Sequence, residues 1–244
     1  MRKIFLTVAA LLLPLPASAA AITVFATGMV GTGIRTLAAS WSTETGNTVT
    51  FIGGSVPTVE TAVTSGQPGD VVILPTGEFA NLTARVKPGA ATAIGRIPFG
   101  LGVAAGAPYP DVSTEAGLQA VLKGARMVSY NQPSLSLAGV AVQKLLARPG
   151  YDGVKVLLLT GGSAGAVARG DADMTLGVLT EELSTKGVEV AGELPAALNI
   201  HIDFSGAVTS DSPQPAAAAS FLAYVSRAQA SAVWKAGGVV APIP

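Results

Sequence analysis

Short apolar runs alternate with segments of helical periodicity along most of the chain. Strands are predicted over residues 22–26, 48–52, 71–74, 99–104, 127–130, 155–160, 174–179, 188–190 and 200–208. Helices are predicted to begin near Thr32, Pro57, Ser113, Leu137 and Pro213. The run 71–74 is apolar without interruption, which is typical of a parallel strand covered on both faces. This alternation of strands and helices predicts a parallel α/β fold.

The length of 244 residues favours two lobes over one. Cores tend to split as chains approach this length, so two smaller sheets are expected in place of one large sheet. The sequence contains no tandem repeat and no charged linker. The strand-like segments 99–104 and 200–204 are therefore predicted to carry the chain from the first lobe to the second and back.

An export signal is predicted at the N-terminus. Two basic residues precede an apolar run over residues 4–15, and the small triplet Ala-Ser-Ala follows at 17–19. This order is that of a secretory signal peptide, residues 1–19. An uncleaved membrane anchor is disfavoured because about 20 apolar residues are needed to span a bilayer. Since the chain has no Cys to carry a lipid, we expect a soluble protein of the bacterial periplasm.

Composition excludes several classes of function. Basic and acidic residues number 15 each, so the chain lacks the excess of positive charge with which proteins neutralise nucleic-acid phosphates. It contains no Cys, which excludes disulfides, thiolate metal sites and cysteine nucleophiles. A single His leaves a metal ion mainly carboxylate ligands, and these lack regular spacing. We therefore expect no nucleic-acid partner, no metal and no cofactor.

Glycine and hydroxyl residues cluster where predicted strands pass into predicted helices. The clusters lie at residues 27–33, 53–55 and 160–163, and Ser134 and Ser136 precede a further helix. Ligands of α/β sheets bind outside the carboxyl ends of the strands, where helix N-termini offer free N–H groups. Each cluster alone is also explained as a tight turn with a helix cap. Their recurrence at successive junctions predicts an anion-binding site.

Two motif matches suggest other chemistries. The glycine spacing over residues 28–33 reverses the dinucleotide-binding fingerprint, and no acidic residue ends the second strand to bind a ribose. Residues 161–165 read Gly-Gly-Ser-Ala-Gly, the pattern of a serine-hydrolase nucleophile elbow, with His201 downstream. However, the helix predicted after Ser163 is short, and His201 lies within a strand pattern. Ser163 is therefore predicted to begin a helix and not to act as a nucleophile.

Four motifs together resemble a known family. They are Ile-Thr-Val-Phe-Ala at 22–26, Glu-Thr-Gly-Asn-Thr-Val at 44–49, Gly-Gln-Pro-Gly-Asp-Val-Val-Ile at 66–73 and Gly-Asp-Ala-Asp at 170–173. Their order and spacing resemble the molybdate-binding type of periplasmic solute-binding proteins of ABC importers. Residues 106–114, 128–130 and 180–181 are more similar to a divergent branch whose relatives handle organic anions. One relative of this fold is an aconitate isomerase.

The resemblance implies a two-lobed α/β fold of the type II, Venus-flytrap kind, with a ligand cleft between lobes that close like a hinge. The first lobe would comprise residues 20–98 and 205–244, and the second would comprise residues 99–204. The implied partners are a small anionic ligand and the membrane subunits of an ABC importer. The chain is expected to act as a monomer.

The same resemblance implies which residues contact the ligand. They are Thr27, Gly28, Met29, Ser55, Tyr130, Asn131 and Thr180. Arg96 is the cation expected nearest to the cleft, where its guanidinium would pair with a ligand carboxylate. Met29 and Val178 or Leu179 stand where the molybdate binders carry Ser and Tyr. A tetrahedral oxyanion needs a ring of polar donors, so an organic carboxylate is expected in preference to molybdate.

The sequence is compatible with two functions. The first is the capture of a small carboxylate for import. The alternative is an aconitate isomerase-like enzyme that shifts a proton along an unsaturated tricarboxylate, which needs only a positioned acid and base. Glu181, Tyr130 and His201 are the candidates for those roles. The small number of catalytic side chains favours binding over catalysis.

Overall fold

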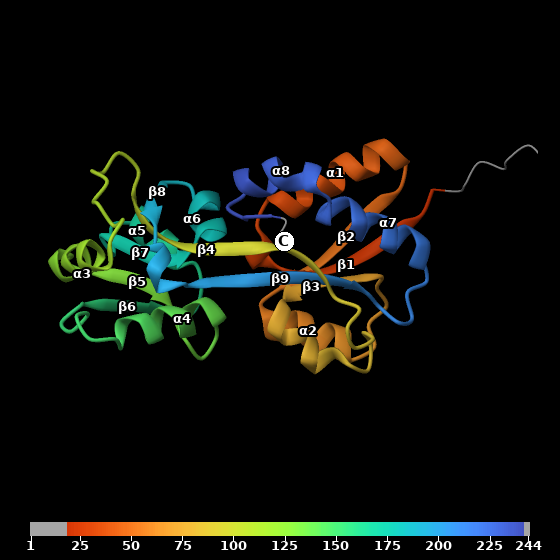
Figure 1. Cartoon of the computed structure of the whole chain (residues 1–244), viewed down its shortest axis with the longest axis horizontal. Coiled ribbons are helices and arrows are strands. Elements are labelled where there is room, and N and C mark those ends of the chain that lie inside the picture. Colours follow the sequence, from red (N-terminus) through yellow and green to blue (C-terminus); the bar gives the residue numbers. More distant parts are fainter. Residues whose placement is uncertain (1–18, 242–244) are drawn as a thin grey trace, which may run out of the picture.

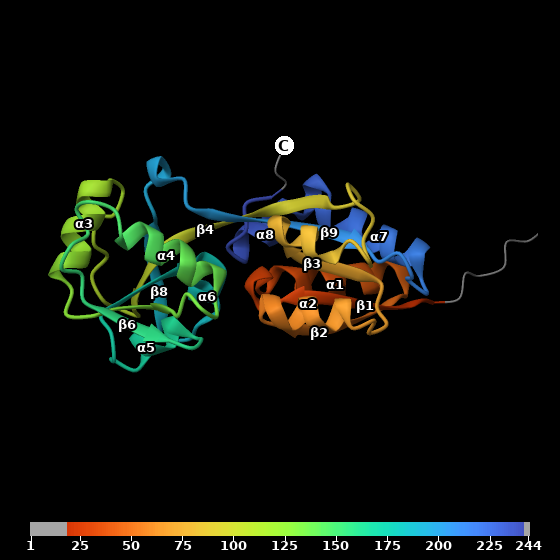
Figure 2. The same ribbon diagram turned by 90° about the horizontal axis from the view of Figure 1, so that it is seen from below.

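The computed structural model describes residues 19–241, which form two α/β lobes side by side (Figure 1). The strands β4 (Thr92–Ala104) and β9 (His201–Val208) cross from one lobe to the other, as Figures 1 and 2 show. The predicted signal peptide, residues 1–19, lies outside the described residues except for Ala19. Within residues 19–241, no helix has the length and apolar character needed to cross a membrane.

The first lobe contains both ends of the described chain. Its strands are β1 (Ala21–Thr27), β2 (Thr48–Gly54) and β3 (Val71–Pro75). Its helices are α1 (Gly33–Thr45), α2 (Val56–Thr64), α7 (Pro215–Ser226) and α8 (Ser231–Ala236), with short 3₁₀ helices at Gly28–Val30, Thr76–Leu82 and Ala228–Ala230. Phe25 of β1 packs in one cluster with Val59 of α2, whereas Val24 belongs to another cluster with Ile34 of α1. The sheet is therefore covered on both faces, as its apolar strands predict.

The second lobe is built from the middle of the chain. Its strands are β5 (Val128–Asn131), β6 (Val156–Leu159), β7 (Met174–Val178) and β8 (Val188–Glu193). Its helices are α3 (Glu115–Gly124), α4 (Leu137–Leu146), α5 (Ser163–Ala168) and α6 (Leu179–Ser184), with a 3₁₀ helix at Ala196–Leu198. Helix α6 begins at Leu179, which the sequence pattern assigns to a strand. Helix α3 is capped by Thr114, whose hydroxyl accepts a hydrogen bond from the Gly117 N–H (3.1 Å), and not by Ser113 as predicted.

One path of paired strands runs through both lobes, in the order β2-β1-β3-β9-β4-β7-β5-β6, and β8 pairs with β4. Strands β2 and β3 run parallel to β1, and β6 and β7 run parallel to β5. Residues 92–98 of β4 pair with β9, and residues 99–104 pair with β7 and β8. The strand pairs divide into two sheets, one in each lobe, as predicted, but the two sheets share β4, which spans 13 residues and pairs in both lobes. The lobe boundaries predicted after residues 98 and 204 fall inside β4 and β9.

Candidate functional site

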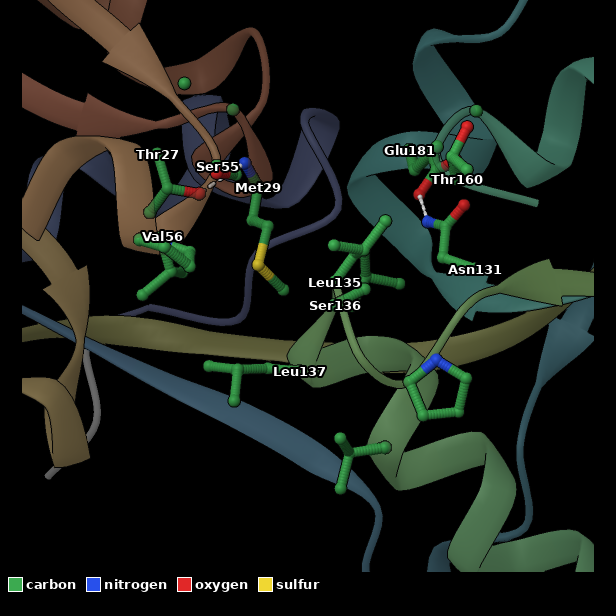
Figure 3. Close-up of a pocket in the computed structure, with 18 of the residues that line it drawn as sticks. Thr27, Met29, Ser55, Val56, Asn131, Leu135, Ser136, Leu137, Thr160 and Glu181 are labelled. Carbon is green, nitrogen blue, oxygen red and sulfur yellow. Dashed lines mark hydrogen bonds between the residues drawn. The ribbon is translucent and has the colours of Figure 1, made fainter. Parts of the chain in front are cut away.

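A cavity of about 570 Å³ lies between the two lobes (Figure 3). This volume falls in the range of about 300–1,000 Å³ that is typical of small-molecule sites. Six residues expected to contact the ligand line it, namely Thr27, Gly28, Met29, Ser55, Asn131 and Thr180. Glu181, a candidate for acid or base, also lines it. The structure thus brings together residues that are more than 150 positions apart in the chain.

The cavity lies where parallel strands of both lobes end. In the first lobe, β1 ends at Thr27 and β2 ends at Gly54, and both residues line the cavity. In the second lobe, β5 ends at Asn131 and β7 ends at Val178, and these residues line it from the other side. This position matches the general rule that ligands of α/β sheets bind at the carboxyl ends of the strands.

Hydroxyl groups at the cavity also cap the turns that begin there. Thr27 Oγ1 accepts a hydrogen bond from the backbone N–H of Met29 (3.0 Å). Ser55 Oγ accepts one from the backbone N–H of Thr58 (3.4 Å), and Ser136 caps α4 in the same way. A hydroxyl that accepts from a turn can still donate its own hydrogen, and the Ser55 hydrogen is available to a ligand when Thr58 is the donor in the hydrogen bond between the Ser55 and Thr58 hydroxyls (2.8 Å). Capping and ligand binding are therefore compatible roles for these residues.

Apolar side chains from both lobes meet in the middle of the cavity. Met29 and Val56 come from the first lobe, and Leu135 and Leu137 come from the second (Figure 3). Leu135 is 52% exposed although it is a large apolar side chain. Of these four residues, only Met29 is expected from the sequence, because the others meet only through the way in which the lobes face each other. Such a lining suits a ligand that has a carbon skeleton.

Carboxylates are the only charged groups among the described residues that line the cavity. They belong to Glu60, Glu78 and Glu181. The Asn81 amide donates hydrogen bonds to Glu60 Oε1 (3.0 Å) and to Glu78 Oε2 (3.2 Å). Burial, and then the neighbouring Glu60, raise the pKa of Glu78. Glu78 therefore holds a proton more readily than an exposed Glu, which reduces the negative charge on that side of the cavity.

A second hollow of about 400 Å³ adjoins the cavity, and one cationic side chain lines it. The two spaces share the lining residues Thr27, Gly28, Gly54 and Ser184. Arg35 of α1 lines the second hollow, with its guanidinium carbon 5.1 Å from the centre of the Phe51 ring. Stacking on an aromatic face orients a guanidinium and leaves its N–H groups free to bind a carboxylate. Arg35 is not predicted by the sequence pattern, although it lies in the first turn of α1, two residues after the glycine-rich junction 27–33.

A chain of hydrogen bonds fixes one of the carboxylates. The backbone N–H of Ser163 donates to Asn131 Oδ1 (3.1 Å), and Asn131 Nδ2 donates to Glu181 Oε2 (3.0 Å; Figure 3). Glu181 Oε1 is shielded from solvent and has no hydrogen-bond partner among residues 19–241. The same holds for the hydroxyl of Thr180, which is 2% exposed. The cavity lining thus contains two polar groups that lack partners.

Three residues expected in the site lie elsewhere. Tyr130 is buried in the core, where burial raises its pKa, because adjacent residues of a strand point to opposite faces and Asn131 takes the cavity side. Arg96 forms an ion pair with Asp203 (2.7 Å). His201 Nε2 lies 3.7 Å from the same carboxylate, and His201 lines a separate hollow. These three side chains do not line the cavity.

Ser163 begins helix α5, as predicted. It is 1% exposed, and its hydroxyl accepts a hydrogen bond from Thr175 (3.2 Å). Its neighbours Gly161 and Gly162 line the cavity, but Ser163 does not. The Gly-Gly-Ser-Ala-Gly segment therefore serves as a strand-to-helix junction beside the cavity.

Two α/β lobes joined by two crossing strands, with a cavity lined from both sides, define the class of two-lobed solute-binding proteins. The chain matches the bacterial extracellular solute-binding protein family over residues 22–240, and it belongs to that family. The family resemblance and the two-lobed α/β fold class predicted from the sequence are confirmed.

Relatives of known function or structure share most of the chain. An aconitate isomerase from a Pseudomonas species is 27% identical over 229 residues, which cover 89% of this chain and 86% of that protein. The periplasmic molybdate-binding protein of Azotobacter vinelandii is 19% identical, with a TM-score of 0.72, over 91% of this chain and all 100% of that one. The sulfate-binding protein of Mycobacterium tuberculosis is 19% identical, with a TM-score of 0.73, over 92% of this chain and 88% of that one. The two structures show that the fold is shared.

Proposed function

We propose that the protein captures a small organic carboxylate in the periplasm and delivers it, as a monomer, to the membrane subunits of an ABC importer. The observation that carries the proposal is the cavity between the lobes, to which both lobes contribute side chains. A ligand that contacts both lobes favours the closed arrangement, which an importer can recognise. Strands β4 and β9 are the proposed hinge, since they join residues 20–98 and 205–244 to residues 99–204.

Two features favour an organic carboxylate over molybdate. The apolar side chains of Met29, Val56, Leu135 and Leu137 match a carbon skeleton, whereas a bare oxyanion would leave its oxygens against them unsatisfied. Arg35 in the adjoining hollow supplies a positive charge and a planar set of donors that fit a carboxylate. The hydroxyls of Thr27 and Ser55 would donate to the remaining ligand oxygens.

A ligand screen tests this proposal. The purified protein is heated in the presence of succinate, malate, citrate, molybdate or sulfate, and its unfolding is recorded. A ligand at 100 times its Kd stabilises the folded state by about 2.7 kcal/mol. We expect at least one carboxylate to raise the melting temperature, with molybdate and sulfate having no effect. If molybdate alone stabilises the protein, the proposed ligand class is wrong.

An aconitate isomerase-like activity is the second candidate. The similarity to the Pseudomonas aconitate isomerase favours it, and so does the position of Glu181 in the cavity lining. A general base must lie within hydrogen-bond reach of the proton that it removes, and Glu181 is the one proposed acid or base that lines the cavity. Incubation with trans-aconitate, followed by NMR, tests for the cis isomer. Conversion that is lost in Glu181→Gln supports the enzyme, and binding without conversion supports the transport protein.

A further inference from the structure

The charged side chains are distributed unequally between the cavity and the adjoining hollow. Within residues 19–241, the cavity is lined by the carboxylates of Glu60, Glu78 and Glu181, and the hollow is lined by the guanidinium of Arg35. That part of the chain contains seven Arg residues, of which six form ion pairs and only Arg35 forms none. Arg35 is therefore available to a ligand, and it can balance one negative charge.

A second carboxylate on the ligand would lie among groups of its own charge. Asn81 holds Glu60 and Glu78 beside each other through its two hydrogen bonds. Burial, and then the neighbouring Glu60, raise the pKa of Glu78. Both effects would also act on a ligand carboxylate in this part of the cavity, because it would lose water and face the same side chains. No cation among residues 19–241 lines the cavity to offset them.

The middle of the cavity is apolar and partly open to solvent. Met29 and Val56 of the first lobe face Leu135 and Leu137 of the second lobe (Figure 3). Leu135 and Leu137 are exposed although both are large apolar side chains. A hydrocarbon group that enters the cavity removes this apolar surface from water, whereas a charged group would lose its own hydration there.

We infer that the preferred ligand is a monocarboxylate with an apolar body, whose carboxylate binds Arg35 and whose hydrocarbon part lies between the lobes. This inference rests on the proposed function and narrows its ligand class. Gly28 lines both spaces, and a Cβ added to it would have no atom within 4 Å. The junction is therefore open to a ligand that extends from the hollow into the cavity.

A pair of acids with the same carbon skeleton tests the charge preference by calorimetry. Adipate has the six carbons of hexanoate and a second carboxylate, and all these carboxylates are ionised at about pH 8. We expect the unaltered protein to bind hexanoate about tenfold or more tightly than adipate, because like charges brought together in a site repel strongly. In the double variant Glu60→Gln/Glu78→Gln, the difference is expected to fall to about threefold or less. Glu193→Gln removes an exposed carboxylate outside the cavity and is expected to keep the original difference.

A series of chain lengths tests the apolar body. Affinity is expected to rise from butyrate through hexanoate to octanoate, by up to about fourfold for each methylene that is buried. The variant Leu135→Ala is expected to weaken the binding of hexanoate by about threefold or more. Leu183→Ala is the matched control, because Leu183 is also 52% exposed but does not line the cavity. Its affinity for hexanoate is expected to stay within about twofold of the unaltered protein.

The inference and the proposed function fail in different ways. If the unaltered protein binds adipate as tightly as hexanoate, or butyrate as tightly as octanoate, the inference is overturned and the capture of a carboxylate stands. An unchanged difference between hexanoate and adipate in a folded double variant also overturns it, and so does binding of succinate, malate or citrate without any monocarboxylate. If none of these acids binds, the proposed function fails together with the inference. The comparisons among ligands of the unaltered protein decide the matter even if a variant does not fold.

Discussion

Arg96 and Asp203 face each other across the two strands that join the lobes. Arg96 Nε lies 2.7 Å from Asp203 Oδ1, and Nη2 lies 3.2 Å from Oδ2, so the guanidinium and the carboxylate form two parallel hydrogen bonds. The hydrogen bond from Arg96 is the main cause of the lowered pKa of Asp203. The positive charge expected to bind a ligand is therefore engaged by a carboxylate at the proposed hinge.

The variant Arg96→Ala tests this structural role. Both side chains are about two-fifths exposed, at 40% and 38%, so solvent screens the pair and its loss is expected to cost about 1 kcal/mol or less. Ligand affinity, measured by calorimetry, is expected to stay within about threefold of the unaltered protein. A loss of affinity of more than about tenfold with unchanged urea unfolding would show that Arg96 contacts the ligand and would contradict its structural role.

Arg35 is expected to take the role that the sequence suggests for Arg96. Replacement by Ala removes a charge-assisted hydrogen bond to the ligand carboxylate, so binding is expected to weaken by about 1.5–3 kcal/mol. Arg35→Lys keeps the charge but loses the planar donors and the stacking on Phe51, and an intermediate loss is expected. Lys123→Ala, at an exposed position of α3, serves as the control. Affinity that is equal in all three variants would exclude an ionic role for Arg35.

Glu182 makes the folded state sensitive to pH. Glu182 is 1% exposed, and neither of its carboxyl oxygens has a hydrogen-bond partner within residues 19–241. The nearby backbone amides of Gly102 and Gly177 lower its pKa, but burial outweighs them. Burial, and then the charge of Glu181, raise its pKa well above the usual value of 4.5. The folded chain therefore keeps a proton that the unfolded chain releases, so stability falls as pH rises from about 4.5 to the folded-state pKa.

The variant Glu182→Gln removes this dependence. Glu182 packs closely against two glycines: a Cβ added to Gly100 would lie 2.7 Å from Glu182 Oε2, and one added to Gly102 would lie 3.3 Å from Glu182 Cγ. Gln fits the same space because it has almost the same shape as Glu. Because the Gln side chain takes up no proton on folding, a gain in the free energy of unfolding is expected in urea unfolding near neutral pH. Little difference is expected at about pH 4. The exposed Glu193→Gln is the control, and parallel pH profiles for Glu182→Gln and the unaltered protein would contradict a neutral buried Glu182.

Ser163 is expected to be unreactive toward a fluorophosphonate probe. A nucleophilic Ser needs an adjacent base, whereas the Ser163 hydroxyl is buried against Thr175, and the only His in the sequence lines a different hollow. Mass spectrometry of the treated protein measures the label. Stoichiometric labelling of Ser163 that is lost in His201→Ala would establish a hydrolase in place of a binding protein.

Local patterns predicted the parts of the fold that depend on neighbouring residues. The apolar runs located β1, β3 and β5, and the junction residues after them located much of the cavity lining. The first half of β4 escaped prediction because Gly95, Arg96 and Pro98 interrupt its apolar pattern. That half is held by pairing with β9, a strand more than 100 residues away. Periodicity within one segment contains no information about such a partner.

In the candidate site, too, local sequence predicts some features, whereas others depend on residues far apart in the chain. Asn131 and Tyr130 are neighbours in one strand, so only one of them can point to the cavity, and alternation alone does not say which. Arg96 lies directly opposite Asp203 in the register of β4 and β9, and this pairing places its guanidinium against the Asp203 carboxylate instead of a ligand. Arg35 of α1 is oriented by the Phe51 ring of β2, and Leu135 enters the site through the way in which the lobes face each other; the sequence pattern contains neither relationship.

The order of the chain also sets the order in which the two lobes can be completed during synthesis. The second lobe is made from one continuous stretch, whereas the first lobe lacks β9, α7 and α8 until the last residues emerge. Until then β3 lacks the strand with which it pairs on one side, β9. Trp41 of α1 likewise lacks its aromatic contact with Phe221, whose ring centre lies 5.3 Å from its own in the folded protein. Contacts over such long separations form slowly. The lobe that begins the chain is therefore expected to be completed last.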